Sequence, residues 1–228
     1  MTRTRFVTST IARKFIAGLT GVLLIAYLVL HLAGNLIFFA GPRLFNLYAH
    51  RLESLGPLLI AAEVALALVF VVHAVIGIQV WLGKRRARPD GYAMTASRGE
   101  PSRKTLSSRS MIVTGIVLAV FIPIHVWMFK FRPTPETMIN GHEARDLYAL
   151  VLDAFKQPAI AWSYALTMLL LGFHLRHGFW SAFQSMGALN RRLLPMFYGI
   201  GLVVALILAG AFVIMPLWIL YMVPAGGM

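Results

Sequence analysis

The stretch LVLHLAGNLIFF, residues 28–39, places His31 and Asn35 inside an apolar run that begins near Phe15. A run of about 20 apolar residues is long enough to cross the hydrocarbon core of a bilayer as a helix. Polar side chains at that depth are costly and usually face the bundle interior for a functional reason. Because four residues separate His31 from Asn35, they share one helix face, one turn apart. The stretch therefore predicts a spanning helix with a polar stripe that faces other helices.

The composition of the whole chain indicates a polytopic membrane protein. Of its 228 residues, 59% are hydrophobic and only 13% are charged, whereas soluble domains are about half apolar and about a quarter charged. The absence of cysteine excludes a disulfide scaffold, a cysteine-ligated zinc site and an iron–sulfur cluster held by this chain. The net charge of +13 resides in short segments between apolar runs, as membrane insertion requires. We therefore expect no nucleic-acid partner.

Five apolar runs set the expected fold. They cover about residues 15–39, 57–82, 111–131, 158–182 and 195–223. Each is too long for a strand of a membrane barrel and lacks its two-residue alternation, so helices are the expected spanning structure. The first run is also too long for the apolar core of a signal peptide. We predict an all-α membrane protein in which residues 1–228 form one domain of five transmembrane helices, without an internal repeat.

The distribution of lysine and arginine predicts the orientation of these helices. Fifteen of the 21 basic residues lie in the N-terminal segment, in the loop after the second run (residues 84–109) and around the end of the fourth run and its loop. The other two loops hold six basic residues and most of the acids. Because cytoplasmic loops carry an excess of lysine and arginine, we expect the N-terminus and the basic second loop to be cytoplasmic.

Four histidines within the predicted helices form two layers. At about 1.5 Å per residue, His31 and His125 reach the same outer depth, and His73 and His174 the same inner depth. Two neutral imidazoles that face each other can hold a haem iron from both sides, which leaves no open coordination position and suits electron transfer. We therefore predict two stacked b haems within the bundle. The alternative is that each histidine makes an ordinary helix–helix hydrogen bond.

Two other features bear on this prediction. His177 lies one turn inward of His174 on the same face, so it could replace His174 as a ligand, bond a haem propionate or simply reach the headgroups. Small residues beside a flat macrocycle would give it room, and the same residues also suit plain helix contacts. The glycines that could serve are Gly18, Gly21, Gly34, Gly77, Gly115, Gly172 and Gly178.

Four segments together resemble a known family. They are HLAGNLIFFAGPRLFNLYA (residues 31–49), VVHAVIGIQVWLGKRRARP (71–89), TGIVLAVFIPIHVWMF (114–129) and FHLRHGFWSAFQSMG (173–187). They are similar to the single-chain dihaem cytochrome b membrane anchors of succinate dehydrogenases and fumarate reductases. The resemblance implies that His31 and His125 hold the distal haem and that His73 and His174 hold the proximal one. The family pattern around the last ligand fits His174 followed by Gly178, which leaves His177 as an extra histidine.

The resemblance also implies partners and a location. Such anchors dock a flavoprotein subunit and an iron–sulfur subunit at the cytoplasmic face of the bacterial cytoplasmic membrane. They carry electrons between succinate and a quinone, usually menaquinone, within respiratory complex II. This chain has no flavin motif and no cluster ligands, so we expect no succinate chemistry from it alone and assign no catalytic residue. The basic second loop would be the docking surface, unless its charge reflects topology only.

Candidate quinone and propionate partners lie at both membrane edges. Ser9, Arg13 and Lys14 form an inner candidate quinone site, and Glu63 with Tyr48 and Asn35 forms an outer one. Glu63 could relay protons or be a neutral structural acid, and Asn35 could instead bond a haem carboxylate or tie two helices together. Gly172 stands where one branch of the family has a proton-carrying glutamate. The candidate propionate partners are Arg13, Lys14, Arg109, Arg176 and His177 at the inner edge, and Arg43 or Arg51 at the outer edge.

Two other functions remain open from the sequence. The chain could be the cytochrome b subunit of another respiratory dehydrogenase or reductase, which would share the haems and dock a different partner. It could also be a haem-free, proton-coupled membrane protein that uses its histidines and Glu63.

Overall fold

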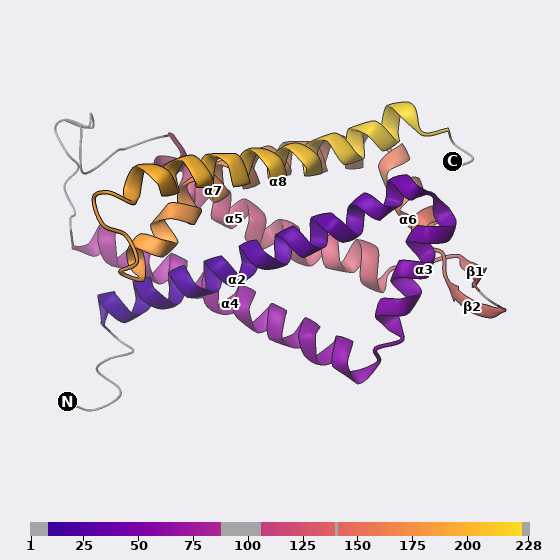
Figure 1. The fold of residues 1–228 in the computed structure, drawn as a ribbon, viewed down its shortest axis with the longest axis horizontal. Helices are drawn as coiled ribbons and strands as arrows, with labels where there is room; N and C mark the ends of the chain where they lie inside the picture. Colours follow the sequence, from indigo (N-terminus) through magenta and orange to yellow (C-terminus); the bar gives the residue numbers. More distant parts are fainter. Residues whose placement is uncertain (1–8, 88–105, 140, 225–228) are drawn as a thin grey trace.

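A computed structural model of the chain describes residues 9–87, 106–139 and 141–224. Within these residues, five long helices run side by side along the longest axis (Figure 1). They are α2 (Thr10–Leu36), α4 (Pro57–Arg86), α5 (Leu106–Val126), α7 (Pro158–Ser185) and α8 (Leu194–Met222). Each is long and apolar enough to cross a membrane. The prediction of an all-α membrane protein with five spanning helices is therefore confirmed.

The helices extend beyond the apolar runs because local capping continues them into polar flanks. α2 begins at Thr10, where the hydroxyl of Ser9 accepts a hydrogen bond from the backbone N–H of Ala12 at 3.1 Å. This is the N-cap arrangement that satisfies an otherwise unpaired donor. α4 and α7 each begin with a proline, which lacks the N–H that the first turn leaves unpaired. Arg3, Arg5 and most of the predicted docking loop lie outside the described residues.

One end of the bundle carries a small cap, which we call the cap end (Figure 1). It consists of the 3₁₀ turn η1 (Ile37–Ala40), α3 (Pro42–Glu53), strands β1 (Glu136–Ile139) and β2 (His142–Arg145), and α6 (Leu147–Lys156). The strands form an antiparallel hairpin in which Glu136 lies opposite Arg145. A π turn, η2 (Trp127–Phe131), ends α5 just below it. α3, the hairpin and α6 fall in segments that were predicted to be loops, so the two short helices are additional structure.

An apolar cluster joins the cap to the bundle. Phe38 stacks on Tyr148 with ring centroids 4.3 Å apart, and Phe45 packs against both rings edge-on. Buried residues of α7 and α8 complete this cluster, including Tyr164 and Ile219. The cap is therefore fixed to the helix ends and positions the residues around the outer predicted layer.

Asn46 connects the two cap helices. Its side chain is buried, donates to Asp146 Oδ1 at 2.8 Å and accepts from the backbone N–H of Tyr148 at 2.9 Å. Asp146 in turn caps α6 by accepting from the N–H of Ala149 at 2.9 Å. The amide group of Asn46 thus provides a hydrogen-bond partner both for the Asp146 side chain, which caps α6, and for the buried backbone N–H of Tyr148.

The four helices that carry the predicted histidine layers are α2, α4, α5 and α7, and α8 packs mainly against α7. α4 is the least enclosed of them, since none of its residues is buried. It contacts α2 more than α5, and its cap-end half diverges from α2 (Figure 1). Protein therefore covers α4 less than it covers any of the other four long helices.

Replacing Asn46 with alanine should destabilise the cap. The change leaves the N–H of Tyr148 and one contact of Asp146 unsatisfied, and a buried polar group without a partner costs about 1–3 kcal/mol. We expect a lower midpoint of thermal unfolding for the detergent-solubilised chain. Ser54→Ala is the matched control, because the Ser54 hydroxyl makes one exposed bond to the carbonyl of Arg51. Equal midpoints for the two variants would contradict this account of the cap.

Candidate functional site

The structure brings His73 of α4 and His174 of α7 together, and we call them the inner pair. Their ring centroids lie 6.4 Å apart and their planes are inclined by 71°. They come from helices whose sequence positions differ by about a hundred residues. Because α4 and α7 run in the same direction, the two imidazoles meet at the same depth in the bundle.

Each ring of the inner pair has its Nδ1 atom held by a neighbouring helix. His73 Nδ1 lies 3.1 Å from Thr20 Oγ1 and 3.2 Å from the carbonyl oxygen of Ala17, both in α2. His174 Nδ1 lies 3.1 Å from Thr114 Oγ1 in α5. With Nδ1 occupied in this way, Nε2 is the nitrogen left to bind another group.

A glycine follows each of these threonines, and the imidazole ring of the histidine packs against it. A Cβ atom on Gly21 would lie 3.3 Å from His73 Cε1, and one on Gly115 would lie 3.4 Å from His174 Cε1. The first distance is shorter than an ordinary carbon contact and the second is at its lower limit, so a side chain at either position would lie directly against the imidazole. These two glycines therefore give room to the histidines themselves.

The other predicted glycines serve different contacts. Gly18 meets the backbone of Ala182, Gly34 meets the ring of Tyr48, and Gly172 meets Ala209. A Cβ on Gly172 would lie 3.0 Å from that of Ala209, so a larger side chain at this position would require α8 to move by a few tenths of an ångström. Gly77 and Gly178, one turn from the inner pair, have open space around the missing Cβ.

The structure also brings His31 of α2 and His125 of α5 together, and we call them the outer pair. Their ring centroids lie 5.7 Å apart with an interplanar angle of 89°. His31 stacks on Tyr27 at 5.5 Å, and His125 stacks on Phe121 at 5.7 Å. In each helix the aromatic residue precedes the histidine by one turn, and it fixes the ring's orientation.

His125 of the outer pair has a polar neighbour in another helix. His125 Nδ1 lies 3.3 Å from the hydroxyl of Tyr164 in α7. His125 follows Pro123, which lies inside α5, and precedes the π turn η2. π turns are frequent at functional sites, and Phe129 in this one packs against Phe155 of the aromatic cluster below the cap.

Asn35 and Ser9 make contacts different from those considered in the sequence analysis. Asn35 donates to the backbone carbonyl of His31 at 2.7 Å, so its amide group bonds its own helix. The hydroxyl of Ser9 caps α2. Both side chains are thus engaged within α2 and its cap, and sequence spacing alone could not reveal this choice.

Glu63 of α4 forms an ion pair with Lys130 of η2 near the cap end. Tyr27, which stacks on His31, is close enough to interact electrostatically with both Tyr48 and Glu63. Tyr48 also packs its hydroxyl against Gly34. A polar cluster of Tyr27, Tyr48, Glu63 and Lys130 thus lies beside the outer pair, and two of its members, Tyr27 and Lys130, were not expected from the sequence.

His177 lies at the opposite end of the bundle from this cluster. Its ring packs edge-on against Trp180 with centroids 5.0 Å apart, and its buried Nδ1 has no hydrogen-bond partner within the described chain. Ser107 of α5 is fully buried and its Oγ also lacks a partner there. The candidate cations at this end are Arg13, which is half-buried, and Lys14, Arg109 and Arg176, which are exposed. At the cap end, Arg43 and Arg51 are also exposed.

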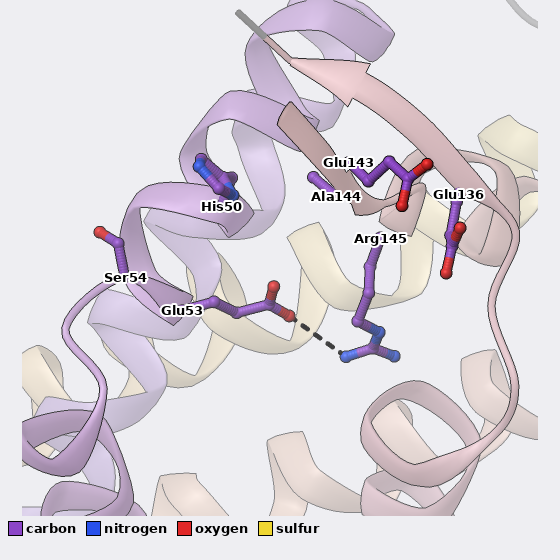
Figure 2. Close-up of a pocket in the computed structure, with 7 residues that line it drawn as sticks. All are labelled: His50, Glu53, Ser54, Glu136, Glu143, Ala144 and Arg145. Atoms are coloured by element: carbon purple, nitrogen blue, oxygen red, sulfur yellow. Dashed lines mark hydrogen bonds and ion pairs between the residues drawn. The ribbon is translucent and has the colours of Figure 1, made fainter. Parts of the chain in front are cut away.

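A surface pocket at the cap contains none of the residues in the two histidine layers (Figure 2). It is lined by His50, Glu53, Ser54, Glu136, Glu143, Ala144 and Arg145. Arg145 donates to Glu53 Oε1 at 3.3 Å, to Thr134 Oγ1 at 2.9 Å and to the carbonyl of Phe129 at 3.2 Å. These bonds tie the hairpin to α3 and η2. Among residues 9–87, 106–139 and 141–224, no group of three or more histidine and acidic side chains could hold a bare metal ion.

Comparisons with known proteins give one informative relative. No family model and no solved structure matches the chain. The succinate dehydrogenase cytochrome b558 subunit of Bacillus subtilis (strain 168) is 27% identical over 159 residues, which cover 68% of this chain and 69% of the relative. With five apolar spans, the chain is a multi-pass protein of the bacterial cytoplasmic membrane. The resemblance predicted from the sequence is confirmed, because over about two thirds of its length the chain is similar to a succinate dehydrogenase cytochrome b558 subunit.

Proposed function

We propose that the chain is the cytochrome b membrane subunit of a succinate:quinone oxidoreductase, respiratory complex II. In this proposal His73 and His174 hold one b haem, and His31 and His125 hold the other. The observation that carries it is the meeting of four imidazoles in two facing pairs, each pair at one depth. The similarity to a cytochrome b558 subunit supports the same assignment.

The spacing of both pairs fits an iron atom between them. An imidazole nitrogen binds a metal at about 2 Å, and the ring centre lies about 1 Å further, so the two ring centres of such a site stand about 6 Å apart. The observed centroid distances of 6.4 and 5.7 Å bracket this value. The Nδ1 contacts of His73, His174 and His125 are of the kind that orients metal-binding imidazoles.

Buried polar atoms without partners fit the carboxylates of a haem. Among the described residues, His177 Nδ1 and Ser107 Oγ are both buried and unsatisfied near the inner pair, and leaving such groups unpaired is costly. Either could donate a hydrogen bond to a carboxylate. This contact gives His177 a role that does not compete with His174 for the iron. Arg13, Lys14, Arg109 and Arg176 lie at the same end and would add charge-assisted bonds.

The residues of this chain would set the conditions for electron transfer. A bound b haem supplies a reversible one-electron couple, whose potential depends on its axial ligands and their hydrogen bonds. The histidines would bind and orient the haems, and the apolar helices would exclude water from them. Oxidation of succinate would occur in a flavoprotein subunit, with an iron–sulfur subunit between it and this chain. The basic loop between α4 and α5, of which residues 88–105 are outside the described structure, would be the docking surface.

A quinone site fits best beside the outer pair. The cluster of Tyr27, Tyr48, Glu63 and Lys130 offers hydrogen-bond donors and a carboxylate next to His31. A quinone requires partners for two carbonyl groups and a route for protons, and this cluster supplies both. At the inner candidate site Ser9 is already engaged as a helix cap, which leaves Arg13 and Lys14. We propose menaquinone as the quinone, following the resemblance to single-chain dihaem anchors.

Haem spectroscopy on histidine variants tests the proposal. The purified wild-type chain should show two b haems in a dithionite-reduced minus oxidised spectrum, quantified as the pyridine haemochrome. His31→Ala and His73→Ala should each lose one haem, and a different one. His142→Ala, in the hairpin, is the control and should retain both. A wild-type chain without haem would overturn the proposal and favour a proton-coupled membrane protein.

Co-purification separates complex II from other respiratory enzymes. The chain extracted from its native membrane in mild detergent should bring with it one flavoprotein subunit and one iron–sulfur subunit. Recovery with a molybdenum or nickel enzyme instead would favour a nitrate reductase, formate dehydrogenase or hydrogenase.

Glu63→Gln tests the quinone site. Removing the carboxylate should lower quinone-dependent electron transfer by the assembled complex tenfold or more, approaching the range of about 10²–10⁴ typical of a lost proton-transfer group. Reduction of a soluble dye by the flavoprotein and the haem content should not change. Glu53→Gln is the matched control, because Glu53 pairs with Arg145 in the cap. Unchanged quinone activity in Glu63→Gln would exclude a proton-transfer role for Glu63.

A further inference from the structure

We propose that Thr20 and Thr114 are positioning residues that hold His73 and His174 in one tautomer, with Nδ1 protonated and Nε2 free to bind iron. This inference rests on the proposed haem function and extends it to two residues outside the ligand set. Three observations support this inference. They are a repeat in the sequence, matching threonine–histidine contacts in the two halves of the bundle, and the hydrogen bonds that the threonine hydroxyls make.

The repeat is visible when the helices are aligned on the outer pair. Residues 20–31 read TGVLLIAYLVLH and residues 114–125 read TGIVLAVFIPIH. Threonine, glycine, one leucine and histidine are identical, and most other positions exchange similar apolar or aromatic residues. In both helices Thr-Gly therefore precedes the outer histidine by the same eleven-residue spacing. No internal repeat was expected from the sequence, and only four of these twelve positions are identical.

The second helix of each half also carries a shared pattern. His73 is followed by Gly77, and His174 by Gly178, at the same spacing. α2 and α5 run in one direction, and α4 and α7 run in the other. The halves α2–α4 and α5–α7 thus have the same order and polarity, as in parallel repeats related by an axis along the membrane normal.

The contacts repeat as the sequence does. Within the first half Thr20 contacts His73, and within the second half Thr114 contacts His174, at 3.1 Å in both cases. A Cβ atom on Gly21 or Gly115 would approach the same ring atom, Cε1, at 3.3 and 3.4 Å respectively. Two independent coincidences of this kind are hard to obtain from ordinary helix packing, so the threonines are part of one repeated ring-binding unit.

The threonine hydroxyls bond carbonyls of their own helices, which favours the imidazoles as the donors to Oγ1. Thr20 Oγ1 donates its single hydrogen to the carbonyl of Ile16 at 2.7 Å, and Thr114 Oγ1 donates to that of Ser110 at 3.0 Å. A hydroxyl has one hydrogen and two acceptor positions. Each Oγ1 therefore accepts from Nδ1–H of its histidine, and this choice leaves the lone pair on Nε2. Accepting from Nδ1–H also makes the imidazole a stronger ligand.

The two halves differ in one detail that sharpens the test. His73 Nδ1 has a second acceptor, the carbonyl of Ala17 at 3.2 Å, whereas His174 Nδ1 is held by the hydroxyl of Thr114. Loss of the Thr20 hydroxyl therefore leaves His73 with a carbonyl that still fixes its tautomer. Loss of the Thr114 hydroxyl removes this constraint from His174.

The experiment compares Thr20→Val and Thr114→Val in the full chain, since valine keeps the shape and removes the hydroxyl. The readouts are the midpoint potential and the retention of each haem, with the inner haem identified as the one that His73→Ala loses. Thr114→Val should raise the potential of the inner haem and weaken its retention by about ten- to hundredfold, and Thr20→Val should do so less. Thr114→Ser should restore both properties. Thr167→Val is the control, because the Thr167 hydroxyl bonds the carbonyl of Ser163 in its own helix.

The outcomes separate this inference from the proposed function. Two haems in the wild type, with Thr114→Val indistinguishable from Thr167→Val, would overturn the role of the threonines and leave the haem assignment standing. Equal shifts of both haems would overturn it too, because the threonines contact the inner pair. Absence of haem from the wild type would overturn both. If Thr114→Val loses both haems, Thr114→Ala, which adds no bulk, takes its place against Thr114→Ser.

Discussion

Four imidazole rings lie among apolar helices, where each must satisfy two ring nitrogens without help from bulk water. An unsatisfied polar group in such surroundings is costly, and this constraint explains much of the arrangement. Nδ1 of His73 and His174 is bound by threonine hydroxyl groups, and Nδ1 of His125 by Tyr164. If each pair holds a haem iron as proposed, the iron would be the partner of the Nε2 atoms.

The proposed haems would also account for the loose packing of α4. None of its residues is buried by protein, although His73 contacts α2. If His73 holds a haem as proposed, α4 must leave space for the macrocycle. The open surroundings of Gly77 and Gly178, one turn from the inner pair, agree with this view. The bundle is tight where rings and threonines meet and open where a flat group would lie.

The sequence predicts the membrane helices and the depth of the histidines well, because hydrophobic run length and rise per residue determine both. It predicts the contacts of single polar groups poorly. Asn35 bonds its own helix carbonyl, a choice set by its rotamer. The cap helices α3 and α6 are short and amphipathic, and their apolar positions lie among charged residues that resemble a loop. Thr20 and Thr114 give no signal singly, since threonine is ordinary in an apolar helix, and only the repeated spacing to His31 and His125 reveals them.

The repeat also locates where the two halves of the bundle differ. Ten residues before the inner histidine, the second half has Tyr164 and the first half has Glu63. Tyr164 lies against His125 Nδ1 at 3.3 Å, whereas Glu63 pairs with Lys130. The threonines and glycines around the inner pair are alike, so the inner layer is built symmetrically for a single task of holding a ring pair. The outer layer replaces a neutral phenol on one side with a carboxylate and an ammonium on the other. The proposed quinone site, which would exchange protons as well as electrons, would need such a difference, and the difference arises beside His31.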